Sequence, residues 1–140
     1  MTDARLSIGA FGLAYAAALA TLLVLDGVWL GVVARDLYQR EMGTLLADSV
    51  KLAPAAVFYL FYPLALVFLT MASPPSGWGE AIGRGAVLGL AAYGAYDLTN
   101  LSILRGWPLQ ISLIDWAWGG VLSAAMAAAA YAVTWARSGS

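Results

Sequence analysis

The chain has 140 residues, of which 62% are apolar and only 11% carry a charge. Soluble domains average about 45–50% apolar and about 25% charged residues, and the mean hydropathy here is +0.80, so the composition indicates a one-domain membrane protein. The net charge of −1 provides no basic surface for nucleic acid. Cysteine and histidine are absent, which excludes disulfides, thiolate metal sites, iron–sulfur clusters and histidine-ligated haem.

Four segments with at most one ionisable side chain in their apolar stretch are long enough to cross a bilayer, which takes about 20 mostly apolar residues. We predict transmembrane helices at about 8–34, 52–73, 82–104 and 110–136, in a single domain that covers residues 1–140. Because a bilayer offers no partners for backbone polar groups, these segments should be helical. The predicted fold is an all-α, four-helix transmembrane bundle with both termini on the same side.

The connections between these segments differ in character. Residues 35–51 interleave charged and apolar side chains, a spacing typical of a short amphipathic helix in the membrane interface. The runs at 73–77 (SPPSG) and 105–108 (RGWP) predict turns. The side that holds the connections 35–51 and 105–108 has four lysine and arginine residues, and the side that holds the termini has three. By the positive-inside rule, this margin of one leans towards termini outside the cytoplasm.

Three of the predicted spans hold one carboxylate each, namely Asp26, Asp97 and Asp115. The helices alternate in direction, and Asp26 and Asp97 come late in their spans whereas Asp115 comes early. All three should therefore lie towards the membrane surface opposite the termini. A carboxylate at the bilayer centre costs about 2.5–3.5 kcal/mol on insertion scales. We therefore expect the three to face the bundle interior together and to retain at least one proton among them.

Polar and aromatic neighbours extend this cluster along the same helix faces. Tyr93 and Asn100 share a face with Asp97, and Asp26 and Asp115 are each followed by a tryptophan three residues later. The candidate ligand-binding residues are Asp26, Trp29, Tyr93, Asp97, Asn100, Asp115 and Trp118. Arg105 is a candidate counter-ion for the acids, or alternatively an anchor at the interface. The structural alternative is that the acids only join helices through hydrogen bonds.

The remaining features point to packing. Tyr59 and Tyr62 are interpreted as aromatic residues that pack between helices. Two glycine pairs at i, i+4 spacing predict close helix contacts, Gly27/Gly31 and Gly85/Gly89. No motif for a metal or a nucleophile accompanies the acids, so no metal site is predicted, and catalytic residues and cofactors stay unassigned.

Several stretches resemble a bacterial family of small inner-membrane proteins catalogued as domain of unknown function 2177. They are residues 25–30 (LDGVWL), 93–101 (YGAYDLTNL), 105–108 (RGWP) and 114–119 (IDWAWG), and the run FYLFY at 58–62 is also similar. The resemblance covers nearly the whole chain. It implies a multi-pass, four-helix protein of the bacterial inner membrane, and it carries no established activity and no site residues.

Three functions remain open from the sequence. The first, which we favour, is a membrane protein that binds a lipid or small molecule in a pocket formed by Asp26, Asp97, Asn100 and Asp115. The second is an intramembrane enzyme that uses those carboxylates on a lipid, although no nucleophile or cofactor motif supports it. The third is an accessory subunit that packs its smooth helix faces against a larger membrane complex or against another copy of itself.

Overall fold

The computed structural model describes residues 5–45 and 51–138. Of these residues, 86% are helical and none lies in a strand, which confirms the all-α class. The helices are α1 (Ile8–Val28), continued by a π-helical segment (Trp29–Val33), α2 (Arg35–Met42) with a 3₁₀ turn (Gly43–Leu45), α3 (Leu52–Met71), α4 (Trp78–Ile103), α5 (Leu109–Ala132) and α6 (Trp135–Ser138).

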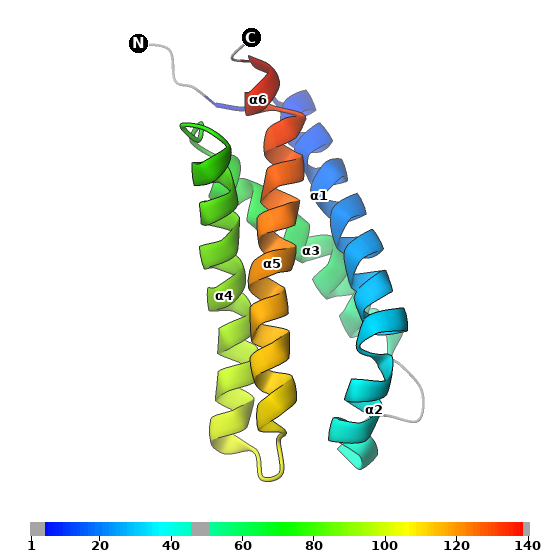
Figure 1. Ribbon diagram of the computed structural model, residues 1–140. Helices are drawn as coiled ribbons and strands as arrows, with labels where there is room; N and C mark the ends of the chain where they lie inside the picture. Colours follow the sequence, from blue (N-terminus) through cyan, green and yellow to red (C-terminus); the bar gives the residue numbers. More distant parts are fainter. Residues whose placement is uncertain (1–4, 46–50, 139–140) are drawn as a thin grey trace.

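The four long helices α1, α3, α4 and α5 form the body of the structure (Figure 1). Helices α4 and α5 make a tight antiparallel hairpin, and α5 also contacts α1 and α3, so α5 is the central helix. The short helix α2 lies beyond the π-helical end of α1 and contacts α5 (Figure 1). The beginning of α1 and the end of α5 lie at the same end of the structure in Figure 1.

Three stretches are long and apolar enough to cross a membrane, namely residues 8–33, α3 and α5. The helix α4 is not among them, and it carries three charged side chains, Glu80, Arg84 and Asp97. Its 26 residues nevertheless give a length of about 39 Å at about 1.5 Å per residue. That length exceeds the roughly 30 Å of a bilayer's hydrocarbon core.

The distribution of apolar side chains suits a surrounding of lipid. The interior is a small core in which Leu22, Leu66 and Leu122 are fully buried. Many large apolar side chains instead point outwards, among them Val32 on the π-helical segment and Phe61 on α3, which are 76% and 63% exposed. Such an apolar exterior is rare on a soluble monomer, and it marks a surface that contacts membrane or protein.

Glycines bring α4 and α5 into close contact. A Cβ atom placed on Gly85 would lie 2.5 Å from the Ser123 carbonyl oxygen, and one on Gly89 would lie 2.2 Å from the Gly119 carbonyl oxygen. A Cβ atom on Gly119 would in turn overlap the ring of Tyr93. The predicted close contact of Gly85 and Gly89 is therefore present, since no larger residue fits there.

The other glycine pair makes no helix contact within the described structure. Gly27 and Gly31 have no atom within 4 Å of a Cβ position, and both are exposed. The buried face of α1 is formed by Ala14, Ala18, Leu22 and Asp26. These residues recur at steps of four, so the glycines fall on another side of the helix.

The ends of the bundle are held in different ways. At the end near the α3–α4 turn, Arg84 donates hydrogen bonds to the carbonyl oxygens of Thr70 (2.8 Å) and Ser73 (2.7 Å) and pairs with Glu80. At the opposite end, Gly106 (φ 79°) provides the left-handed conformation of the α4–α5 turn. The helix α2 occupies part of the expected amphipathic segment, and residues 46–50 of that segment lie outside the described residues.

Candidate ligand-binding cavity

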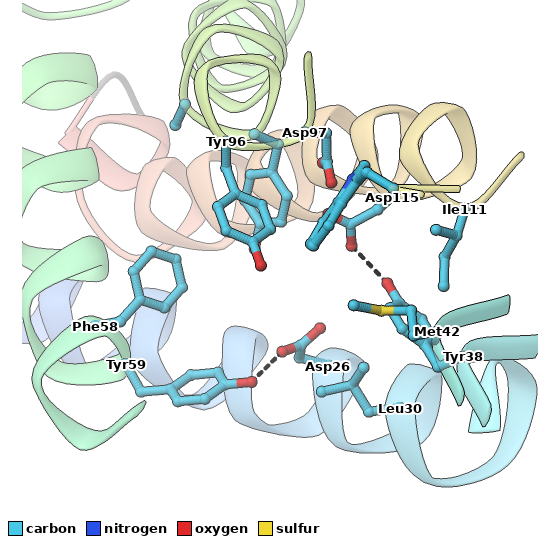
Figure 2. A pocket seen from close by; sticks show the side chains of 13 residues that line it. Asp26, Leu30, Tyr38, Met42, Phe58, Tyr59, Tyr96, Asp97, Ile111 and Asp115 are labelled. Carbon is cyan, nitrogen blue, oxygen red and sulfur yellow. Dashed lines mark hydrogen bonds between the residues drawn. The ribbon is translucent and has the colours of Figure 1, made fainter. Parts of the chain in front are cut away.

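A cavity of about 450 Å³ lies at the end of the bundle near the α4–α5 turn (Figure 2). Three acids, six aromatic residues and four aliphatic ones line it: Asp26, Leu30, Tyr38, Met42, Phe58, Tyr59, Ala92, Tyr93, Tyr96, Asp97, Trp107, Ile111 and Asp115. The lining contains no lysine and no arginine. Each of α1, α2, α3, α4 and α5 contributes to it.

The alternating helix directions explain why these side chains meet. Asp26 lies near the end of α1 and Asp97 near the end of α4, whereas Asp115 lies near the beginning of α5. Asp26 is 8% exposed and Asp97 is 3% exposed, while Asp115 is half-buried. The cavity therefore gathers three acids that are distant in sequence and largely shielded from the surroundings.

Asp26 has two hydrogen-bond donors. The Tyr59 hydroxyl on α3 donates to its Oδ2 atom (Figure 2), and the Trp118 indole on α5 donates to its Oδ1 atom at 3.1 Å. Trp118 also stacks on Trp29, with ring centroids 4.5 Å apart. Asp26 thus joins α1 to α3 and α5, and both its oxygens have partners.

Asp115 joins α5 to the short helix α2. The Tyr38 hydroxyl donates to Oδ1 of Asp115 at 2.6 Å (Figure 2). Burial raises the pKa of the Tyr38 phenol above its ordinary value, and the hydrogen bond to Asp115 raises that pKa further. Tyr38 therefore remains protonated and acts as a donor throughout the physiological pH range.

Asp97 is the acid whose hydrogen bonding is incomplete. Within the described parts of the chain, its buried Oδ2 atom has no hydrogen-bond partner. Its carboxyl group lies beside that of Asp115 (Figure 2). A carboxylate only accepts hydrogen bonds, so the two groups can share one only when either of them holds a proton. Asp97 therefore lines the cavity and holds an acceptor that lacks a partner whenever both carboxyl groups are ionised.

Trp107 has a buried hydrogen-bond donor without a partner among the described residues, its indole Nε1 atom. The ring packs edge-to-face on Tyr96, with centroids 5.8 Å apart and planes at 86°. Since an indole N–H can only donate, the lining contains one unsatisfied donor together with one unsatisfied acceptor.

The structure brings together some of the residues predicted from the sequence and separates others. Four line the cavity: Asp26, Tyr93, Asp97 and Asp115. Trp29 and Trp118 form the stacked pair beside Asp26 without lining the cavity. Asn100 is half-buried and Arg105 is exposed, and neither lines it. In the described ranges, no group of three or more acidic residues is arranged to hold a metal ion.

Sequence reasoning missed several lining residues. Tyr59 was interpreted as a packing residue, but its hydroxyl donates to Asp26. The sequence could have indicated this contact, because α3 starts at the end of the bundle where the acids lie and Tyr59 is in its first half. Tyr62, one turn further along, does pack in the interior, where its hydroxyl is 2.6 Å from that of Ser123. For Tyr38 and Trp107 the sequence pattern offered no such indication. Their positions relative to the cavity depend on how α2 and the α4–α5 turn pack against the bundle.

Residues 11–132 match a family described as a predicted membrane protein, DUF2177. No curated protein and no solved structure matches the chain.

Proposed function

Since the chain belongs to the DUF2177 family of membrane proteins, we propose that it is a multi-pass protein of the bacterial inner membrane that binds a lipid or small molecule in its acid-lined cavity. The observation that carries the proposal is Asp97, which lines a space of about 450 Å³, is 3% exposed and has one oxygen without a hydrogen-bond partner among the described residues. An ionisable residue inside a membrane bundle marks a candidate functional site.

The proposal includes a fourth membrane crossing by α4. This helix packs antiparallel against α5 through glycines, so it shares the depth of a helix that is apolar enough to span. Its acid, Asp97, faces the interior of the structure. Apolar helices that pair their own backbone groups are suited to an inner membrane, whereas proteins of the bacterial outer membrane are mostly β-barrels.

Single cysteines test this topology cleanly, because the chain has none of its own. We place one at Thr2, one at Ser138 and one at Leu104, near the α4–α5 turn, and label each with an impermeant reagent from either side of the membrane. Four crossings put positions 2 and 138 on one side and position 104 on the other. Labelling of positions 2 and 138 from opposite sides would mean that α4 does not cross.

The lining has the character of a ligand site. Such sites are about 300–1,000 Å³, mostly apolar or aromatic, with a few polar groups that orient the ligand. Leaving a buried polar group without a partner costs about 1–3 kcal/mol, so a ligand that serves Asp97 and Trp107 recovers free energy. The favoured ligand has an apolar body and a polar head that donates a hydrogen bond to Asp97.

Native mass spectrometry of the purified protein tests binding. The wild-type chain should retain a small molecule or lipid that is lost from Asp97→Asn, in which folding is preserved because asparagine still forms hydrogen bonds. Asp36→Asn is the matched control, since Asp36 is exposed on α2 and does not line the cavity. If Asp97→Asn retains the same adduct and only its stability falls, the acids join helices and do not bind a ligand.

A further inference from the structure

The charge of the cavity lining is entirely of one sign. Asp26, Asp97 and Asp115 line it, and no lysine or arginine does. The basic side chains that lie nearest in sequence to lining residues are exposed and are not part of the lining, namely Arg35, Arg40 and Arg105. A cavity with this charge attracts a cation and disfavours an anion, and low-dielectric walls strengthen both effects.

Aromatic rings form much of the remaining wall. Six of the thirteen lining residues are aromatic, contributed by α2, α3, α4 and the α4–α5 turn. The faces of such rings attract cations within about 6 Å, by roughly 2 kcal/mol or more when the cation is desolvated. Phe58 and Tyr96 both line the cavity, and neither hydrogen-bonds to an acid in the network described above (Figure 2).

The oxygen of Asp97 that lacks a hydrogen-bond partner favours a cation that can donate a hydrogen bond. Its Oδ2 atom needs a hydrogen-bond donor, and a protonated amine carries N–H donors whereas a quaternary ammonium has none. A positive charge between Asp97 and Asp115 would also let both carboxylates stay ionised, without sharing a proton. A neutral alcohol can donate to Asp97 but leaves the like charges of this pair unbalanced.

From this geometry we propose that the cavity binds a protonated amine carried on an apolar molecule. The inference rests on the proposed ligand-binding function and adds the chemical class of the ligand. The ammonium lies between Asp97 and Asp115 and faces the aromatic wall, and the apolar part extends along the aliphatic lining residues. The same ammonium is present in a free hydrophobic amine and in the headgroup of phosphatidylethanolamine.

The test compares probes of equal length and different heads on the full chain in a neutral maltoside detergent. Decylamine, decanol and decyltrimethylammonium are titrated near neutral pH, where decylamine is protonated, with binding measured by calorimetry against protein-free detergent. We expect decylamine to bind at least tenfold more tightly than either of the other probes. In Asp97→Asn the ratio of decylamine to decanol affinity should fall towards one, and in Asp36→Asn it should stay at the wild-type value.

A second arm distinguishes the two sources of the ammonium. If solubilised phosphatidylethanolamine displaces decylamine and phosphatidylglycerol does not, the site binds the lipid headgroup. If neither lipid displaces decylamine, the site binds a free amine. Equal binding of decylamine and decanol overturns the inference and leaves a ligand cavity in place. Stronger binding of decyltrimethylammonium overturns the role of the Asp97 hydrogen bond. These comparisons use the wild-type chain, so they stand even if Asp97→Asn does not fold.

Absence of binding by every probe, together with no retained adduct in mass spectrometry, overturns the inference and the proposed function together. A retained adduct without an amine group overturns only the inference. The two failures are therefore distinguishable by the identity of the adduct.

Discussion

The indole rings of Trp29 and Trp118 lie nearly parallel, with centroids 4.5 Å apart and planes at 7°. They come from the π-helical end of α1 and from α5, and α1 and α5 contact each other along the bundle. The same Trp118 ring donates its N–H to Asp26 at 3.1 Å. Stacking therefore fixes the indole that orients this carboxylate, and the two tryptophans support the cavity without lining it.

We expect Trp118→Phe to destabilise the protein by about 1 kcal/mol. Phenylalanine preserves the stacking on Trp29 but removes the donor to Asp26, and intramembrane hydrogen bonds average about 0.6 kcal/mol, up to about 1.7. Unfolding in mixed detergent micelles measures the difference. Trp78→Phe is the control, because Trp78 is 51% exposed and lies at the beginning of α4, away from the cavity. Equal effects of both changes would contradict a specific role for the Trp118 N–H.

Tyr59→Phe should be coupled to Asp26→Ala. Each single change removes the hydrogen bond between α3 and α1, so Tyr59→Phe should cost less once Asp26 has been replaced. A double-mutant cycle of unfolding free energies should return a coupling of about 1 kcal/mol. Additive effects would mean that the two side chains only pack against each other.

The two glycine pairs offer a sharp contrast in packing. Gly89→Ala should destabilise the α4–α5 contact by about 1–3 kcal/mol, because its Cβ would lie 2.2 Å from the Gly119 carbonyl oxygen. Gly27→Ala should be neutral or stabilising, since nothing lies within 4 Å of that position and alanine favours helix by about 1 kcal/mol. Thermal unfolding of both variants measures this. A stability loss at Gly27→Ala equal to that at Gly89→Ala would show that the contact does not govern the effect.

Glu80 should contribute to stability in a pH-dependent way. The Ser76 hydroxyl and backbone N–H, followed by Arg84, stabilise its charged form and hold the pKa of Glu80 below its usual value. The contribution is full above the unfolded pKa of about 4.3 and disappears as the pH falls through the lowered folded value. The stability difference between wild type and Glu80→Gln should therefore be present at neutral pH and vanish in strong acid. A difference that persists in acid would contradict this assignment.

The sequence was most informative where hydropathy and helix direction decide the outcome. Charge-poor stretches identify α1, α3 and α5, since few alternatives to a helix exist for apolar segments of that length. That Asp26, Asp97 and Asp115 meet at one end of the bundle follows from counting residues along helices of alternating direction. This counting needs no knowledge of side-chain contacts.

Contacts between elements were beyond the sequence. The contact between Tyr38 and Asp115 depends on the position of α2, which follows the π-helical segment. At the end of that segment the Ala34 N–H donates to the carbonyl of Trp29, five residues earlier, and not to the residue four earlier as in an α-helix. Which glycine pair forms a contact depends on the rotation of each helix about its axis. Period and spacing are identical for 27/31 and 85/89, so the sequence pattern could not separate them.

The interlocking of α4 with α5 also bears on how the chain enters a membrane during synthesis. By itself α4 is the least favourable of the four long helices to insert, because Glu80, Arg84 and Asp97 oppose its partitioning into lipid. Its partner is the next helix made by the ribosome, joined by a short turn at Gly106. We therefore expect α4 to enter as a hairpin with α5, so that a chain truncated after Ile103 fails to integrate this helix while the full chain succeeds.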